Sequence, residues 1–329
     1  MSLRAGGSYP ASQELDPPRR ELMAPGGPSS REAVSPMPEY RITHQTVYRH
    51  SAPAAAAWQM LQLQPREEAA QECVDFQLEI DPAAPDLSTR QDFFGNTRHF
   101  FSVREPHREL AITSHAVVRR DAPALPLPGL SPSAVETRER TRALIQSGEN
   151  PLLEQYLCAT PLVPLVPAAA ALAAALDPHE PVLAWIERLG RKFAETFTFD
   201  PTATDISTPL VQVLEQKRGV CQDFTHLFLS CARQYGLPAA YVSGYLLTSP
   251  PPGQPRLRGA DAMHAWASIH VPEIGWVDYD PTNSCFAGIG HIVVARGRDY
   301  ADVSPTHGVF TGSYSPRLRV AVTVEPVES

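Results

Sequence analysis

Short runs of alternating or continuous apolar residues fill the region from residue 39 to about residue 120. The runs cover residues 40–49, 58–63, 74–80, 98–103 and 110–118, and clusters of Pro, Asp and Gly separate them. Strands that follow one another closely, joined by short turns, are typical of an antiparallel β-sandwich. The pattern therefore predicts a small β-sandwich domain over residues 39–120.

A helical pattern replaces the strands after residue 134. Helices are expected over residues 134–146, 167–176, 181–195, 210–216 and within 219–236, and strands follow to the C-terminus. Helices followed by strands indicate an α+β fold. We therefore expect a second domain over residues 135–329, joined to the first by a proline-rich linker over residues 121–134.

Composition adds a tail and excludes some partners. Residues 1–38 contain seven Pro, four Gly and six Ser, which predicts a disordered tail. The net charge is −8 and basic residues are not clustered with aromatic ones, so nucleic acid is not an expected partner. The most apolar stretch, residues 161–176, is short and interrupted by prolines, so no membrane span is expected. Because no apolar segment follows Arg4, the cytoplasm is the expected compartment.

The five cysteines lie at positions 73, 158, 221, 231 and 285, without a Cys-x-x-Cys pair. This spacing is not typical of a structural zinc site or of a disulfide framework. A metal site made of Cys221, His226 and Cys231 would also lack the ligand spacing that zinc sites use. We therefore expect neither a metal nor a cofactor, and most of these cysteines are predicted to be small buried apolar residues.

Cys221 differs from the other four cysteines in its local context. It follows Gly219 and Val220, and the apolar residues after it recur at helical spacing up to Cys231. Cys221 is thus predicted to begin a buried helix, where the partial positive charge and unpaired N–H groups of the helix start stabilise a thiolate. A nucleophilic cysteine and a buried structural cysteine are both compatible with this position.

A cysteine nucleophile needs a base, and the base needs an acceptor that orients it. His264 alternates with Trp266, Ser268 and His270 on one face of a predicted strand, and Asp278 and Asp280 lie on one face of the next strand. If the two strands form a hairpin around residue 273, Asp280 lies opposite or diagonal to His264 and Trp266. Cys221, His264 and Asp280 are therefore the candidate catalytic residues.

Three other residues compete for these roles. Asp278 is the alternative orienting acid, although Asp280 reaches the end of its strand beside a Pro-Thr-Asn turn. His226, five residues after Cys221, points about 140° away from it on a helix and is predicted to be structural. Asp223, in the first helical turn, is expected to stabilise the helix dipole.

Several stretches resemble the bacterial transglutaminase-like superfamily. They are Arg218-Gly-Val-Cys-Gln-Asp-Phe-Thr-His, Gly236-Leu-Pro-Ala-Ala-Tyr-Val-Ser-Gly-Tyr, His264-Ala-Trp and Gly275-Trp-Val-Asp-Tyr-Asp-Pro-Thr-Asn, with further similarity at Gly297-Arg-Asp-Tyr and Asp92-Phe-Phe-Gly-Asn. The resemblance covers about residues 40–325. It implies a papain-like transglutaminase core of helices packed on an antiparallel sheet, preceded by a small β-sandwich domain.

The resemblance also implies a chemistry. Cys221 would attack an amide carbonyl of a peptide or protein, His264 would transfer the proton, and Asp280 would orient the imidazole. The thioester would then be resolved by water or by an amine, and neither outcome is favoured by the residues. The chain departs from the family at Ala240, where Arg is frequent, and it has no Asp-rich loop like the calcium sites of animal transglutaminases. The alternative is a catalytically silent binding or scaffold module on the same fold.

Overall fold

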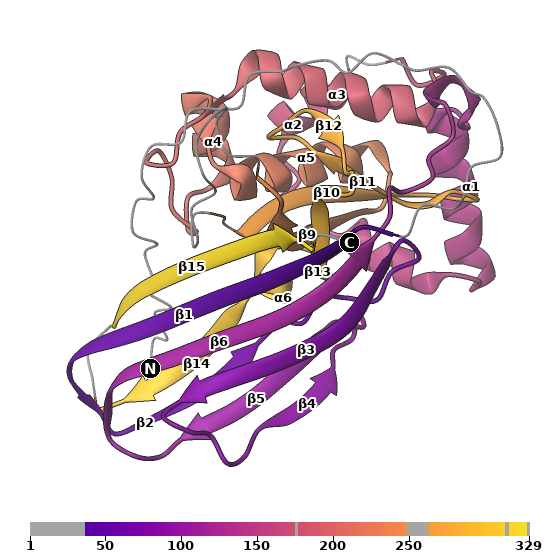
Figure 1. The fold of residues 1–329 in the computed structure, drawn as a ribbon. Helices are drawn as coiled ribbons and strands as arrows, with labels where there is room; N and C mark the ends of the chain where they lie inside the picture. The colour runs from indigo at the N-terminus through magenta and orange to yellow at the C-terminus, as the bar shows by residue number, and fades with distance from the viewer. Residues whose placement is uncertain (1–36, 175–176, 249–260, 262, 313–315, 328–329) are drawn as a thin grey trace, which may run out of the picture.

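The structure is a computed structural model that describes residues 37–174, 177–248, 261, 263–312 and 316–327. Nearly all of the tail predicted over residues 1–38 lies outside the described residues. Figure 1 shows two parts: long strands that form one end of the molecule, and a sheet covered by helices at the other.

Two antiparallel four-stranded sheets form the β-sandwich. One has the order β15-β1-β6-β3 and contains β1 (Glu39–Ala54), β3 (Gln71–Asp81), β6 (His107–Arg120) and β15 (Arg317–Pro326). The other has the order β14-β2-β5-β4 and contains β2 (Ala56–Leu61), β4 (Ser88–Gln91), β5 (Thr97–Val103) and β14 (Thr306–Thr311). Side chains from both sheets bury one another between them, among them Tyr48, Leu61, Phe101 and Ile112.

The five strands predicted between residues 40 and 118 are all present. β4 was not predicted, because its sequence Ser-Thr-Arg-Gln is polar and all four residues are exposed at a sheet edge. β14 and β15 come from the C-terminal end of the chain and pair with β2 and β1. The two N-terminal sheets therefore include strands from residues 306–326. The division of the chain into two domains near residue 134 stays a prediction.

Five helices begin within one residue of the predicted positions: α1 (Ala134–Ser147), α2 (Pro167–Ala174), α3 (Val182–Thr196), α4 (Leu210–Gln216) and α5 (Cys221–Tyr235). The short α6 (Tyr300–Val303), in a region predicted to hold only strands, and the 3-10 turns at Pro128–Leu130 and Pro151–Tyr156 were not predicted. Ser133 and Glu136 form a reciprocal capping box at the start of α1, and Gly148 ends that helix in the left-handed conformation.

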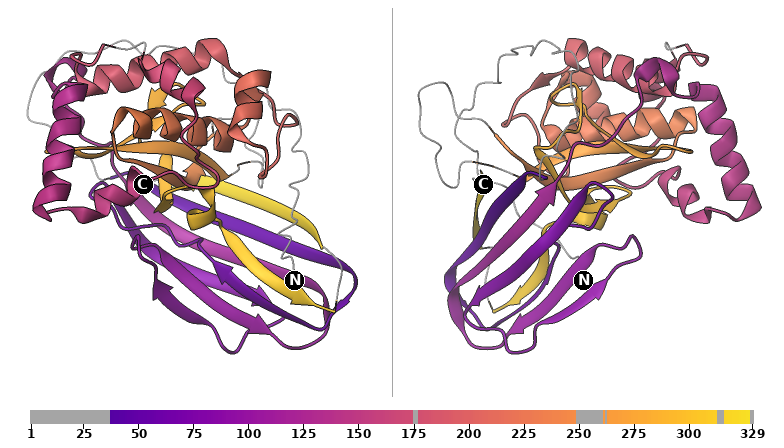
Figure 2. Two further views of the ribbon diagram at one scale, coloured as in Figure 1. Left: turned by 180° about the vertical axis from the view of Figure 1, so that it is seen from behind. Right: turned by 45° about the vertical axis from the view of Figure 1, so that its right-hand side comes forward.

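The helices cover a five-stranded antiparallel sheet of order β12-β11-β10-β9-β13 (Figures 1 and 2). Its strands are β9 (Ala239–Leu246), β10 (Met263–Val271), β11 (Gly275–Asp280), β12 (Cys285–Phe286) and β13 (His291–Gly297). A two-residue parallel pair, β7 (Thr198–Phe199) and β8 (Arg218–Gly219), precedes α5. α5 packs on this sheet through its apolar face, and the ring of Phe228 stacks on Tyr279 of β11 at 5.5 Å between centroids.

Two side-chain amides from the N-terminal region bind the free edge of β13. The amide of Gln71 accepts from the N–H and donates to the C=O of Val293, both at 2.8 Å. The amide of Asn96 makes the same pair of bonds with Arg296, at 2.8 and 2.7 Å. An edge strand leaves a row of backbone groups unpaired, and these amides satisfy four of them as a neighbouring strand would. The sandwich therefore fixes the edge of the helix-covered sheet.

Candidate active site

Cys221 is the first residue of α5, and its side chain is partly buried. Asp223, two residues later, accepts a hydrogen bond from the N–H of Val220 at 2.8 Å and another from Thr204 at 2.5 Å. A Cβ on Gly219 would lie 2.7 Å from the Asp223 carboxylate, so only glycine leaves room for that carboxylate. The entry to the helix is thus fixed by Gly219 and Asp223, which leaves the sulfur of Cys221 at the helix start.

His264 lies near the start of β10 and connects Cys221 with Asp280. Its Nε2 lies 2.7 Å from Oδ2 of Asp280, and Cys221 is close enough to the ring to contribute to raising the pKa of His264. Because Nε2 binds the carboxylate, Nδ1 is the ring nitrogen left for the sulfur. The structure therefore brings the three predicted residues into one neighbourhood around His264.

The predicted hairpin accounts for this meeting. β10 and β11 pair with Ala267 opposite Tyr279 and Val271 opposite Gly275, so the turn is centred on Glu273. This register puts Asp280 diagonal to His264, as the alternation of the two strands predicted. Glu273 has a φ of 74°, which permits the tight turn.

Asp280 is fully buried and accepts five hydrogen bonds. Oδ2 accepts from His264, from Nδ2 of Asn283 at 2.6 Å and from His291 at 3.2 Å. Oδ1 accepts from the backbone N–H groups of Thr282 and Asn283, at 2.9 and 3.1 Å. These donors replace the water that a carboxylate loses on burial. Both oxygens are therefore held in fixed positions.

The charges of this pair support each other. Burial alone would lower the pKa of His264, but the carboxylate of Asp280 and the thiol of Cys221 outweigh it and raise that pKa to about 10. Burial also disfavours the ionised form of Asp280, but His264 and His291 hold the pKa of that carboxyl far below its ordinary value. An imidazolium facing an ionised carboxylate is therefore the favoured state of the pair at neutral pH.

Asp278, the alternative orienting acid, faces a different set of partners. It forms a bidentate ion pair with Arg296 of β13, at 2.8 and 3.1 Å, and accepts hydrogen bonds from Trp266 and Ser268. Its pKa is lowered because the Arg296 charge outweighs its burial. None of these partners is His264, so Asp278 ties β10, β11 and β13 together.

His226 is structural, as the helical geometry predicted. Its Nε2 accepts a hydrogen bond from the N–H of Tyr300 at 3.2 Å, and its ring packs on Tyr241. Burial, together with the positive charge of Arg233, lowers the pKa of His226 to about 3. A ring held neutral and occupied in this way is poorly suited to act as the base for Cys221.

The remaining cysteines occupy varied positions. Cys231 is buried and burial raises the pKa of its thiol, which donates to the C=O of Ala169. Cys73 is partly buried and its pKa is raised to about 11. Cys158 and Cys285 are exposed, which differs from the prediction that most of these residues are buried. Both lie at element ends, Cys158 just after a 3-10 turn and Cys285 in a two-residue edge strand, where a small side chain is not covered.

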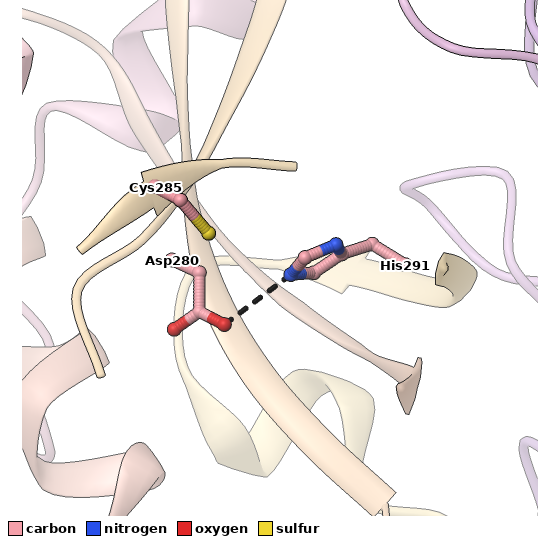
Figure 3. A group of neighbouring side chains, drawn as sticks. All are labelled: Asp280, Cys285 and His291. Carbon is pink, nitrogen blue, oxygen red and sulfur yellow. Dashed lines mark hydrogen bonds and ion pairs between the residues drawn. The ribbon is translucent and has the colours of Figure 1, made fainter. Parts of the chain in front are cut away.

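One group of side chains could offer ligand atoms to a metal. Ligand atoms of Asp280, Cys285 and His291 lie within 4.8 Å of one another (Figure 3). However, Nδ1 of His291 accepts a hydrogen bond from the N–H of Gly288 at 3.2 Å, so the ring proton lies on Nε2, the nitrogen that faces Asp280. A metal at Nε2 would move that proton to Nδ1, against the N–H of Gly288. The hydrogen bonds therefore fit a donor from His291 better than a metal ligand.

Reasoning from the sequence missed His291, Asn283 and Arg296 as neighbours of the two acids. Asn283 lies in the Pro-Thr-Asn turn that had been noted only as a turn. His291 and Arg296 are polar residues in a strand that is otherwise apolar and fully buried. That contrast was the available signal, because a buried polar residue needs a partner.

Two protein-family models match the chain. Residues 40–119 match the model of the bacterial transglutaminase-like N-terminal region, and residues 170–281 match that of the transglutaminase-like superfamily. The second match includes Cys221, His264 and Asp280. The chain belongs to the transglutaminase-like superfamily, and it has the papain-like transglutaminase core preceded by a β-rich domain.

Relatives extend over nearly the whole chain. The chain is 40% identical to "Uncharacterized protein Rv2569c" of Mycobacterium tuberculosis over 88% of this chain and 93% of the relative. It is 32% identical to "Uncharacterized protein ML0607" of Mycobacterium leprae over 86% and 97%. Among solved structures, "The Crystal Structure of a Putative Cysteine Protease from Cytophaga hutchinsonii" matches with a TM-score of 0.65 over 90% of this chain and 92% of that one, at 15% identity. That likeness shows a shared fold.

Proposed function

We propose that the protein is a cysteine-dependent acyltransferase or amidase that acts on amide bonds of peptides or proteins. The observation that carries the proposal is the hydrogen bond from His264 to Asp280, with Cys221 close enough to the same ring to raise its pKa. Cys221 is partly exposed at a helix start, so its sulfur combines a base, a favourable helix dipole and access. The superfamily membership supports the same general class.

The proposed reaction has two half-reactions. The resting pair is the Cys221 thiolate beside the His264 imidazolium, and the thiolate attacks the amide carbon. The C–N bond then breaks, and the leaving amine takes the proton from His264, which leaves a thioester on Cys221. Neutral His264 then takes a proton from water or from a second amine, which attacks the thioester; the C–S bond breaks, the product leaves, and the thiolate–imidazolium pair is restored. Asp280 does not change its protonation but stabilises the imidazolium in each half-reaction.

Both outcomes, hydrolysis and transamidation, remain open in this proposal, and the substrate is expected to be a peptide or protein. The expected compartment is the cytoplasm, where thiols such as the five free cysteines stay reduced. Among the described residues, no helix is long and apolar enough to cross a membrane.

A peptide screen tests the proposal. Short Gln-containing peptides are incubated with the protein, with and without an added primary amine, while ammonia release and the intact protein mass are followed. We expect an acyl adduct on Cys221 and ammonia release, both absent in Cys221→Ala and retained in Cys158→Ala, the matched variant of an exposed cysteine. Amine incorporation would identify transamidation, and free Glu peptide would identify hydrolysis. If a broad screen of peptide amides yields no adduct on Cys221, the proposal is wrong and the scaffold alternative is favoured.

A further inference from the structure

His291, the first residue of β13, binds Asp280 beside His264, and the centroids of the two rings lie 6.4 Å apart. It is 7% exposed, and its Nε2 lies 3.2 Å from Oδ2 of Asp280, the same oxygen that binds His264 (Figure 3). Two imidazoles therefore share one carboxylate oxygen. We propose that His291 is a positioning residue of the acyl-transfer site, which donates its Nε2 proton to Asp280 and keeps that carboxylate turned toward His264. This inference rests on the proposed function.

The direction of the hydrogen bond follows from the other ring nitrogen. Nδ1 of His291 accepts from the N–H of Gly288 at 3.2 Å, and a backbone N–H can only donate. Nδ1 therefore carries a lone pair and the ring proton lies on Nε2. The backbone at Gly288 thus selects the tautomer that can donate to Asp280.

The ring of His291 is also fixed in place. It packs edge-on against Trp266 at 5.2 Å between centroids, and the indole N–H of Trp266 is held by Asp278. The backbone of β13 is bound along its free edge by the amides of Gln71 and Asn96. The N-terminal region therefore contributes to holding the strand that carries His291.

The donor has a consequence for Asp280. A carboxylate that accepts fewer hydrogen bonds is less stable in its ionised form, so removing His291 raises the pKa of Asp280. It also removes one of the three donors that fix Oδ2. His264 would then lose part of its orientation, and the imidazolium that the thiolate needs would be less stable.

The experiment compares His291→Phe with His291→Gln. Phe keeps a ring of similar size without a donor, whereas a Gln amide can reach the position of Nε2 and donate. Alkylation of Cys221 by iodoacetamide is followed from pH 4 to 9 by mass spectrometry, together with the melting temperature. We expect the pH below which Cys221 loses reactivity to rise by about one unit in His291→Phe, with a rate at pH 6 lower by about threefold, and to return close to the wild-type value in His291→Gln.

The control is His270→Phe, a histidine of the same sheet whose ring contacts Trp276. This variant should leave unchanged the pH below which Cys221 loses reactivity. If His291→Phe lowers the melting temperature but the pH below which Cys221 loses reactivity stays at its wild-type value, His291 is only structural and the inference is wrong. The proposed function fails separately, by slow alkylation of Cys221 in the wild-type protein itself.

A second measurement avoids dependence on folding of the variants. Nitrogen-15 NMR of the wild-type histidine rings reports which ring nitrogen of His291 carries the proton. The inference requires the proton on Nε2. A proton on Nδ1 would overturn it.

Discussion

The imidazole of His264 and the carboxylate of Asp280 meet across the neighbouring strands β10 and β11, with Nε2 2.7 Å from Oδ2. The contact depends on the hairpin register, because a shift of one residue would turn Asp280 to the opposite face of the sheet. Asp278, two residues earlier on the same face, instead binds Arg296. The two acids of one strand therefore have separate tasks.

Replacing Asp280 with Asn is expected to lower acyl transfer by about 10³-fold or more. An Asn side chain carries two donors, but both oxygen positions of Asp280 are lined by N–H groups, from His264 and His291 at one and from Thr282 at the other. In either orientation, the N–H groups of the introduced amide would therefore face N–H groups of the surrounding protein. Peptide turnover, or acylation of Cys221, measures the effect. Asp75→Asn at an exposed position is the control, and equal rates in both variants would contradict the assigned role of Asp280.

The ion pair predicts a loss of stability at high pH. The folded-state pKa of His264 is raised to about 10, whereas an unfolded histidine titrates near 6.5. The resulting stabilisation is complete below about pH 6.5 and is lost as the pH rises through 10. Within this window the free energy of unfolding should fall by about 1.4 kcal/mol per pH unit. The lowered pKa of Asp280 acts oppositely: its contribution is present above about pH 3.9 and is lost as the pH falls.

Urea unfolding at pH 7, 8, 9 and 10 measures this slope. The wild-type protein should lose stability over this range, while His264→Gln, which has no titrating ring, should show a flatter profile. Parallel profiles for the two proteins would mean that His264 is not charged in the folded state at neutral pH.

Asp278→Asn should destabilise the fold by about 1.5–3 kcal/mol, because the buried Arg296 loses its bidentate partner but keeps its ion pair with Glu68. The double variant Asp278→Asn with Arg296→Met should recover part of this loss, since no unpaired charge remains in that pair. Denaturant unfolding measures both. Folded Asp278→Asn should still alkylate rapidly at Cys221, and a loss of that reactivity comparable to the loss in Asp280→Asn would show that the two acids are not separate.

Asn96→Ala should weaken the attachment of β13 to the N-terminal region. The N–H and C=O of Arg296 would lose their amide partners, at a cost of about 1–3 kcal/mol. Hydrogen exchange at the Arg296 amide should become faster. Gln77→Ala serves as the control, because its amide binds only the exposed Asp75 among the described contacts. Unchanged exchange at Arg296 would contradict the view that Asn96 attaches β13 to the N-terminal region.

Much of this fold followed from local pattern. Alternation gave the five strands between residues 40 and 118, and helical spacing gave α4 with its observed bounds. β4 escaped because its four polar residues carry no apolar period. The pairing of β14 and β15 with N-terminal strands also escaped, because contacts between distant segments leave no periodic signal in one sequence.

The candidate site was predictable where side chains alternate on neighbouring strands. The expected hairpin put Asp278 and Asp280 on one face, and the place of Asp280 at the strand end favoured it as the partner of His264. His291 and Asn283 were not found, because their relation to Asp280 depends on how β13 and the turn after β11 fold back. Asn96, in the Asp-Phe-Phe-Gly-Asn stretch, binds β13 because the sandwich packs against the helix-covered sheet. The local sequence around Asn96 gives no sign of that packing.

The central claim is that His264, oriented by Asp280, holds the sulfur of Cys221 as a thiolate. The rate of iodoacetamide labelling of each cysteine between pH 5 and 9 tests it most directly, because an ordinary thiol with a pKa near 8.5 loses about tenfold in rate per unit below that pH. We predict that Cys221 keeps most of its rate down to about pH 6, while the rate of the exposed Cys158 falls steeply over the same range, and that His264→Ala removes the difference. A Cys221 profile that parallels Cys158, unaffected by His264→Ala, would contradict the account.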